Sequence, residues 1–384
     1  MFVCYVDFRK AFDSVWRKGL WTVMRFYGYP EKIVKILENA YKDTFSAVRV
    51  GGSLTEWFKT VVGVLQGDVL SPLLFAIFLE IIVVTSLEDI DIGAWINGHR
   101  LTDLRFADDI ALLAESERSL QEALSSLWQN SKQMGMKINA AKTETQLLGY
   151  GRESLSIELE GQALKHTDEF VYLGGVMNAV EGTEADVKRR IGIARGIFQM
   201  LSKIWTERDL SKALKIEVFE VMVISALLYN SETWVIKAAT KNRLKAFEMA
   251  CLRKIEGVTK RDRIRNTEIH SRLNWHKDIN KRIQQRRLKY LGHVARMNTE
   301  RYPYVAFYGQ VQGTRRKGRQ KKRWVDTIKQ DCKEMHLKFY DAIQMTQNRQ
   351  VWRKSVEELL TRVDSTSPSK LRRRDIGSNT IRRR

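Results

Sequence analysis

Cysteine, proline and long hydrophobic runs are scarce in this chain of 384 residues, which has only three cysteines and four prolines. The cysteines, Cys4, Cys251 and Cys332, are odd in number and far apart, which indicates a reducing compartment and no disulfide framework. The longest apolar run, residues 73–84, is interrupted by Glu80 and is too short to span a bilayer. The first residues also lack the basic segment of a signal peptide. We therefore expect an intracellular protein, nuclear or cytoplasmic, with no membrane partner.

Acidic residues are scarce only in the second half of the chain. Residues 1–180 contain 18 Lys and Arg against 23 Asp and Glu, whereas residues 181–384 contain 48 against 22. The first half therefore has a net charge of −5 and the second of +26. So strong a basic excess indicates a polyanionic partner bound by the second half.

The hydrophobic pattern predicts an α+β fold, an antiparallel sheet with helices on one face, followed by long amphipathic helices. Asn97-Gly98 predicts a hairpin turn, Ser71 and Pro72 predict a helix N-cap and first turn, and Gly135 predicts a helix end. The expected strands are 2–8, 46–50, 136–138, 146–148 and 170–173, and the expected helices are 31–42, 71–87, a segment ending near 135, 214–229 and 243–255.

Two adjacent carboxylates, Asp108 and Asp109, lie between the apolar runs 101–106 and 110–115, at the tip of a predicted β-hairpin. Like charges this close repel, which raises the pKa of one of them unless a cation lies between them. Mg²⁺ is the usual counterion because it binds carboxylate oxygens together with water and substrate phosphate. Asp is also common in solvated turns, so the pair alone is open to both interpretations.

Asp7 is the candidate third carboxylate because it ends the apolar strand at the start of the chain. If that strand and the hairpin are neighbours, Asp7 lies opposite Asp108. Two metal ions held there would activate a 3′-hydroxyl and stabilise the leaving pyrophosphate of an in-line displacement. Taken alone, Asp7 fits the role of a helix N-cap better than that of a metal ligand.

Five motifs in order resemble the palm of a reverse transcriptase from a non-LTR (LINE-type) retrotransposon. They are YVDFRKAFDSV (5–15), GVLQGDVLSPLLF (63–75), FADD (106–109), GMKINAAKTE (135–144) and FVYLGG (170–175). The resemblance implies a polymerase palm at 1–176, a helical thumb-like region at 177–260 and a basic helical region at 261–364. Residues 365–384, polar and Arg-rich, are predicted to be disordered.

The resemblance also implies roles for individual residues. Asp7, Asp108 and Asp109 would be catalytic and hold two Mg²⁺ ions, with Mn²⁺ as an alternative, Asp109 being less directly involved. Phe12 would be the bulky gate against a ribonucleotide 2′-hydroxyl, although an apolar residue on a helical stretch is as readily part of the core. The remaining nucleotide-binding residues would be Gln66, Gly67 and Lys142, and the primer grip would be Tyr172, Leu173 and Gly174; Gly67 and Lys142 are also ordinary loop residues.

Basic and aromatic residues are interleaved late in the chain, in segments that resemble LINE-type carboxyl regions: ALLYNSETW (226–234), RRLKYLGHVARM (286–297) and GRQKKRWVDTIKQD (318–331). Such residues neutralise phosphates and stack bases. The expected nucleic-acid contacts are Arg286, Arg287, Arg315, Arg316, Arg319, Lys321, Lys322, Arg323 and Trp324. A solvated charged face is the alternative.

The leading hypothesis is an RNA-directed DNA polymerase that acts on an RNA template, a DNA primer and deoxynucleotide triphosphates. Only six residues precede Asp7, where family members carry a fingers region and many also carry an endonuclease. We therefore expect weak or absent activity. The alternatives are a non-catalytic nucleic-acid-binding remnant of a retroelement and an RNA-dependent RNA polymerase, which Phe12 disfavours. Oligomeric state is left open.

Overall fold

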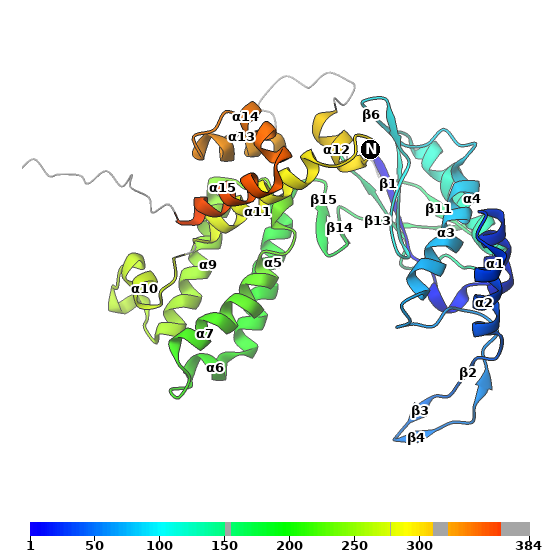
Figure 1. Cartoon of the computed structure of the whole chain (residues 1–384), viewed down its shortest axis with the longest axis horizontal. Helices are drawn as coiled ribbons and strands as arrows, with labels where there is room; N and C mark the ends of the chain where they lie inside the picture. Colours follow the sequence, from blue (N-terminus) through cyan, green and yellow to red (C-terminus); the bar gives the residue numbers. More distant parts are fainter. Residues whose placement is uncertain (150–154, 277, 310–321, 362–384) are drawn as a thin grey trace, which may run out of the picture.

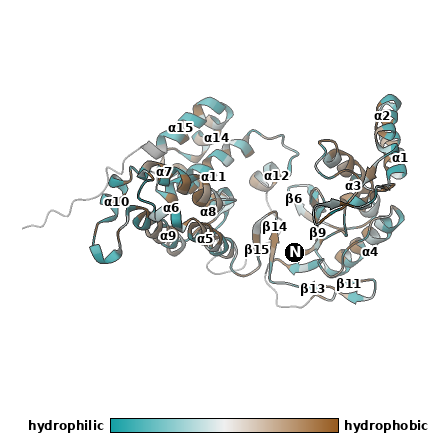
Figure 2. Cartoon of the chain, turned by 90° about the horizontal axis from the view of Figure 1, so that it is seen from below, coloured by the Kyte–Doolittle hydropathy of each residue, from teal (hydrophilic) through white to brown (hydrophobic). Residues whose placement is uncertain are grey.

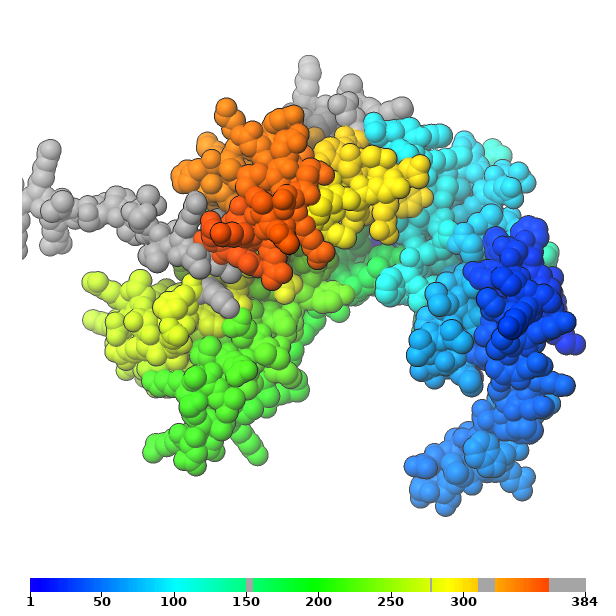
Figure 3. All heavy atoms as spheres, in the orientation of Figure 1, coloured from blue at the N-terminus to red at the C-terminus, as the bar shows by residue number. Residues whose placement is uncertain are grey.

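The computed structural model describes residues 1–149, 155–276, 278–309 and 322–361. Its outline is an arch: a lobe that carries the main sheet and a helical lobe are joined at the top and separated by a wide opening below (Figure 3). The sheet lies on the right in Figure 1, and helices α5 to α10 lie on the left. The predicted mixture of sheet and helix is therefore present: one lobe contains the main sheet with helices α1 to α4, and the other contains helices.

The main sheet has five strands within the described residues, in the order β13-β10-β1-β9-β8. Neighbours are antiparallel except for β10 and β13, which are parallel. β1 is central and pairs with β9, as the sequence predicts, so the strand before Asp7 and the strand after the Asp pair are direct neighbours. The strands are β1 (Phe2–Val6), β8 (Asp103–Phe106), β9 (Asp109–Ala114), β10 (Glu144–Leu147) and β13 (Lys165–His166).

Helices cover one face of this sheet, and the first hydrophobic core lies between them. Leu112 of β9, Phe75 and Phe78 of α3 and Leu124 of α4 are completely buried there. Figure 2 shows α3 as largely hydrophobic, which fits its central position. The helices of this lobe are α1 (Arg17–Phe26), α2 (Glu31–Lys42), α3 (Ser71–Leu87) and α4 (Glu117–Gln133). α3 begins where the sequence predicts, but Ser71 is its first residue and not its N-cap: the Ser71 hydroxyl donates to the Leu65 carbonyl at 2.5 Å.

Short hairpins cover the opposite face of the sheet or extend from its lobe. Tyr5 of β1 stacks on Phe170 of β14 with ring centroids 3.8 Å apart, so one hairpin packs directly on the sheet. The hairpins are β6 (Ala94–Ile96) with β7 (His99–Leu101), β14 (Glu169–Tyr172) with β15 (Gly175–Asn178), β11 (Glu158–Leu159) with β12 (Gln162–Ala163), β2 (Phe45–Ser46) with β5 (Phe58–Lys59), and β3 (Arg49–Val50) with β4 (Ser53–Leu54). The strand expected at 46–50 is thus split in two, and the one expected at 136–138 is reduced to a single bridge between Phe8 and Ile138.

The helical lobe has its own core, built around the buried aromatic residues Trp205, Phe219, Trp234 and Trp275. Its helices are α5 (Thr183–Met200), α6 (Ser202–Thr206), α7 (Lys212–Val218), α8 (Ser225–Leu227), α9 (Ala238–Glu256) and α10 (Asn266–Arg272). The helix predicted at 214–229 is therefore interrupted, because residues 219–224 between α7 and α8 form a π-helical turn.

A third, smaller core lies among the last described helices and contains Leu288, Leu291, Ile328, Cys332 and Trp352. These helices are α11 (Ile279–Ala295), α12 (Tyr302–Tyr308), α13 (Trp324–Glu334), α14 (Phe339–Gln347) and α15 (Arg349–Thr361). In the part of the chain that the structure describes, no helix combines the length and the hydrophobicity that crossing a membrane requires. The tail predicted to be disordered lies outside the described residues.

Candidate active site on the central strands

Asp108 and Asp109 lie at a tight turn between β8 and β9, as the sequence predicts. Phe106 pairs with Asp109 as the last pair of the ladder, which leaves Ala107 and Asp108 as the two turn residues. Ala107 has a φ of 53°, a left-handed conformation that two-residue hairpin turns require. Asp108 is half-buried and Asp109 is exposed, so both carboxylates are presented at the end of the sheet.

Asp7 follows directly after β1 and lies beside this turn. Val6 pairs with Ile110, so the register places Asp7 alongside Asp109, one position from the predicted partner Asp108. Its backbone is fixed by the segment that contains GMKINAAKTE: the Asn139 amide donates to the Asp7 carbonyl at 2.7 Å. Asn139 Nδ2 also donates to Asp7 Oδ2 at 3.3 Å. Asp7 is not a helix N-cap, because the next helical turn begins only at Phe12.

The three carboxylates repel one another. The pKa of Asp109 is raised, first because the surrounding protein removes water from its carboxyl group and then because Asp108 and Asp7 are negatively charged. Within the described residues, no group of three or more His, Cys, Asp or Glu side chains is arranged to hold a metal ion by itself. Mg²⁺ is commonly bound by one or two carboxylates, with waters and substrate phosphates as its other ligands. The excess of negative charge and the oxygen donors therefore fit a metal ion shared with a substrate.

The predicted nucleotide-binding residues lie on three segments around the aspartates. Phe12 is half-buried and its ring stacks on Phe75 of α3 at 4.5 Å, so it is both packed and partly accessible. Gln66 and Gly67 are in an exposed loop, and Gly67 has a φ of 90° with open space where a side chain would point. Lys142 is exposed and has no ion-pair partner among the described residues.

Asp13 and Arg17 support this loop, and no sequence pattern indicates a role for Arg17. Asp13 accepts a hydrogen bond from Gln66 Nε2 at 3.1 Å, which agrees with a structural role for Asp13. The buried Arg17 guanidinium donates to the carbonyls of Tyr41, Thr60, Val62 and Gly63 and to Thr44 Oγ1, at 2.8 to 3.3 Å. These bonds fix the chain that leads into the Gln66 loop.

The predicted primer-grip residues form the turn of the β14–β15 hairpin. Tyr172 ends β14, and Leu173 and Gly174 are the turn, with φ values of 47° and 75°. The Tyr172 hydroxyl donates to the Leu104 carbonyl of β8 at 3.1 Å. Its pKa is raised to about 12, mainly by burial and then by the charges of Asp109 and Asp103. The hairpin therefore lies beside the strands that carry the aspartates.

A cluster of polar contacts joins this hairpin to the helical lobe; we call Asp186, Arg190, Tyr229 and Trp234 the joint. The buried Asp186 carboxylate of α5 accepts from the Val176 amide of β15 at 3.2 Å and from Trp234 Nε1 at 2.7 Å.

The other two joint residues hold the hairpin turn itself. Arg190 lies over the Tyr229 ring at 4.2 Å and donates to the Gly174 carbonyl, while the Tyr229 hydroxyl donates to the Leu173 carbonyl at 3.1 Å. Tyr229 and Trp234 belong to the ALLYNSETW segment. Its two aromatic residues were a sequence signal for the joint.

The predicted nucleic-acid contacts of the basic region separate into exposed and buried residues. Lys322 is exposed, Arg323 pairs with Asp326 at 3.2 Å, and Arg286 donates to the Leu228 carbonyl at 2.9 Å. Arg315, Arg316, Arg319 and Lys321 lie outside the described residues.

Arg287 and Trp324 are instead structural. Arg287 is buried and makes two hydrogen bonds with Asp331, at 2.8 and 2.9 Å, so its guanidinium is not available to a phosphate. Trp324 donates to the Glu232 carbonyl at 2.8 Å, and its ring packs edge-on against Phe307 and Tyr290. We therefore exclude both residues from the expected nucleic-acid contacts of the basic region.

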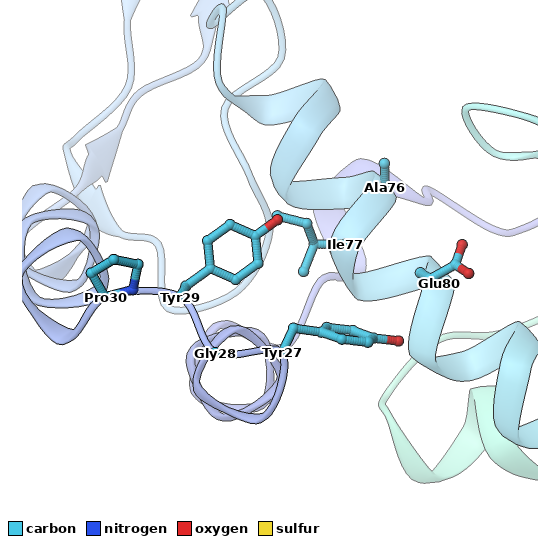
Figure 4. Close-up of a pocket in the computed structure, with 7 residues that line it drawn as sticks. All are labelled: Tyr27, Gly28, Tyr29, Pro30, Ala76, Ile77 and Glu80. Atoms are coloured by element: carbon cyan, nitrogen blue, oxygen red, sulfur yellow. The ribbon is translucent and has the colours of Figure 1, made fainter.

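A hollow of about 510 Å³ on the sheet-bearing lobe lies apart from these residues (Figure 4). Tyr29 points toward Ile77 of α3 and Tyr27 toward Glu80. Glu80 also forms an ion pair with Arg105 at 2.7 Å. None of the three aspartates lines this hollow, and its acidic residue is already neutralised, so we assign no chemistry to it.

Comparisons with known proteins agree with this arrangement. Residues 2–177 match the family model described as reverse transcriptase (RNA-dependent DNA polymerase). A putative uncharacterized transposon-derived protein of Caenorhabditis elegans is 28% identical over 248 residues, which cover 62% of this chain and 87% of that protein. The Pol polyprotein of the type-2 retrotransposable element R2DM of Drosophila melanogaster is 32% identical over 185 residues, 44% of this chain and 17% of the polyprotein.

One further sequence relative and one solved structure are also similar to this chain. The RNA-directed DNA polymerase from mobile element jockey of Drosophila funebris is 26% identical over 282 residues, 69% of this chain and 29% of the polymerase. A solved telomerase from Candida tropicalis has 13% identity, covers 79% of this chain and 49% of that chain, and has a TM-score of 0.35, too low to carry an argument. This chain spans less than a third of the length of the R2DM and jockey proteins.

The match over residues 2–177 shows that this part of the chain, which contains the main sheet and the β8–β9 turn, is similar to reverse transcriptases. The R2 and jockey relatives support a more particular likeness, to the LINE-type reverse transcriptases of non-LTR retrotransposons.

Proposed function

We propose that this chain carries out RNA-directed DNA synthesis, adding deoxynucleotides to a primer 3′-hydroxyl on an RNA template. The observation that carries the proposal is that Asp7, Asp108 and Asp109 lie together at one end of β1 and β9, where burial and then the charges of Asp108 and Asp7 raise the pKa of Asp109. A site with uncompensated negative charge favours a divalent cation and a substrate that brings phosphates with it. In this proposal the main sheet is the palm and residues 177–260 are the thumb.

The surrounding residues have roles that follow from where they lie. Asp7 and Asp108 would hold the metal ions, and Asn139 keeps the Asp7 carboxylate in place. Phe12 is half-buried and stacks on Phe75, and its bulk would exclude a ribonucleotide 2′-hydroxyl. Lys142, which is exposed, would supply a positive charge for the triphosphate, and the turn at Leu173 and Gly174 would support the primer.

Bound metal ions would lower the pKa of the primer 3′-hydroxyl and neutralise charge on the pyrophosphate leaving group. The aspartates would contribute carboxylate oxygens, with waters and substrate phosphates as the other ligands of such ions. The β8–β9 turn contributes by fixing Asp108 on a two-residue loop, where its backbone has little freedom.

Primer extension on an RNA template with Mg²⁺ tests this proposal. We expect the wild-type chain to extend the primer and Asp108→Asn to lose extension by a factor of about a hundred or more, the size usual for loss of one charge-stabilising group. Asp89→Asn is the matched control, because Asp89 is exposed beyond the end of α3 and loses the same charge. Equal extension by Asp108→Asn and the wild type would refute the catalytic role of the turn.

A second candidate function is nucleic-acid binding without turnover. The observation that favours it is the concentration of charge: residues 181–384 have a net charge of +26, while the aspartates lie in the half with −5. Salt-dependent RNA binding by the full chain with no extension under any metal would support this candidate. Incorporation of ribonucleotides in place of deoxynucleotides would instead indicate an RNA polymerase.

A further inference from the structure

A hollow of about 820 Å³ lies between α11, the segment before α12, and α15, away from the aspartates. Its basic lining consists of Lys289 of α11, Arg296 directly after α11, Arg301 before α12, and Arg349 and Arg353 of α15. His293, Met297, Asn298 and Trp352 complete the lining. In Figure 3 the yellow and orange-red surfaces that contain these helices meet on the face toward the viewer. Five Arg and Lys side chains from three segments therefore converge on one concave surface.

Carboxylates do not balance this charge. Glu357 pairs with Arg353 at 2.9 Å and lies 4.0 Å from Lys289, so one carboxylate serves two cations. Among the residues that the structure describes, neither Arg301 nor Arg349 has an ion-pair partner. Such a surface is more positive than solubility alone requires.

Arg296 shows that the cations affect one another. It is partly buried, and its Nη1 donates to the Thr346 carbonyl at 2.6 Å, which fixes the guanidinium at the wall. Its pKa is lowered, first by loss of water and then by repulsion from Arg349. An anion in the hollow would relieve that repulsion, as a metal ion would relieve the repulsion among the aspartates.

The tryptophan in the lining of the hollow is packed into the core and offers no stacking platform. Trp352 is 2% exposed and donates from Nε1 to the Leu288 carbonyl at 2.9 Å. A Cβ at Gly292 would lie 2.5 Å from the Trp352 ring, so glycine in the middle of α11 is what allows the indole to pack there. With its tryptophan buried, the lining presents charge and not aromatic faces, which suits a nucleic-acid backbone better than bases.

We propose that this hollow binds consecutive phosphate groups of a nucleic-acid backbone, without reading sequence. The choice of nucleic acid as the polyanion rests on the proposed function. The hollow is larger than one phosphate requires, and its cations are distributed over three segments, so a chain of phosphates fits it better than a single small anion.

The test is the salt dependence of RNA binding by the full chain. The affinity for a labelled single-stranded RNA is measured over a range of KCl concentrations for the wild type and for the double variant Arg301→Gln with Arg349→Gln. Each phosphate contact contributes about 0.7 to the slope of log affinity against log salt for single strands, so the slope should fall by roughly 1.4. The control, Arg118→Gln with Lys32→Gln, removes two exposed helix charges from the other lobe and should leave the slope unchanged.

Two results would overturn the proposal. One is an equal slope for the double variant and the wild type. The other is a double variant that inorganic phosphate no longer stabilises against thermal unfolding, although its RNA affinity equals that of the wild type. That result would indicate a small-anion site. Binding is measured in EDTA without nucleotides, so a chain that fails to extend primers but shows the slope change would refute the polymerase proposal and leave this one supported.

Discussion

Asp186 of the joint offers a sharp test of how the hairpin is held beside the active site. The change Asp186→Asn keeps the shape of the side chain but replaces one carboxylate oxygen by an amide, which cannot accept a hydrogen bond. Either the Val176 amide or the Trp234 indole then loses its acceptor, and both groups are buried. Arg190, whose Nε lies 3.8 Å from the carboxylate, loses its negative neighbour as well.

The expected loss of stability follows from these contacts. A hydrogen bond to a charged group contributes about 1.5–3 kcal/mol, and breaking a buried ion pair by removing one partner costs about 3–5 kcal/mol. Because Arg190 keeps its contacts with Tyr229 and Gly174, we expect a free-energy loss of about 3 kcal/mol. For a folding unit of about 150–250 residues, this loss corresponds to a fall in Tm of roughly 6–12 °C.

The role of the joint is separated from simple destabilisation by a matched variant. Asp331→Asn breaks the buried, two-bonded pair with Arg287 in the third core, far from the hairpin, and should cost a similar free energy. Only Asp186→Asn should speed hydrogen exchange at the Val176 amide and raise the KM for primer–template more than it lowers kcat. Asp186→Glu should partly restore the slow hydrogen exchange at the Val176 amide and the lower KM for primer–template. Equal exchange at Val176 in the two Asn variants would refute the reasoning.

Three further outcomes are expected. The pKa of Asp109 is raised in the fold, so the native state keeps a proton that the unfolded chain has lost, and stability falls as pH rises through the raised pKa. Thermal unfolding in EDTA should therefore show that Asp109→Asn is more stable than the wild type at neutral pH. In strong acid the two proteins should be similarly stable. Burial raises the pKa of Glu248 from 4.5 to about 7, so about 3 kcal/mol of stability present below pH 4.5 should be lost by pH 8, and Glu248→Gln should remove this pH dependence in urea unfolding. Gly67→Ala forces a φ of 90° on a residue with a side chain, at a cost of about 1–2 kcal/mol, so nucleotide KM should rise and Tm should fall by about 2–8 °C.

Local patterns were sufficient to predict the hairpin at Asp108 and the start of α3, because each depends on neighbours in sequence. The adjacency of β1 and β9 could be predicted by assuming that the apolar strand before Asp7 and the apolar strand that begins at Asp109 belong to one sheet. The position of Asp7 alongside Asp109 did not follow, because register depends on which side chains enter the core.

Residues whose partners are distant in sequence were not predictable in the same way. Arg17 is adjacent to exposed Lys18 and was indistinguishable from it, yet it binds carbonyls up to 46 positions away. Arg287 carried a usable signal, since it is four residues from both Ile283 and Leu291 and so falls on the apolar stripe of α11. Its neighbour Arg286 is off that stripe and stays partly accessible.

The division of charge gives the joint its importance under the proposed function. The aspartates lie in the half with a net charge of −5, which by itself repels a polyanion, whereas the half with +26 attracts one. Nucleic acid held by the basic half reaches the carboxylates only if the two halves keep a fixed relation. The contacts that fix it, from Asp186 to Val176 and from Tyr229 to Leu173, are short, buried or directed at the turn itself. Weakening them should therefore reduce the productive placement of a primer more than its binding.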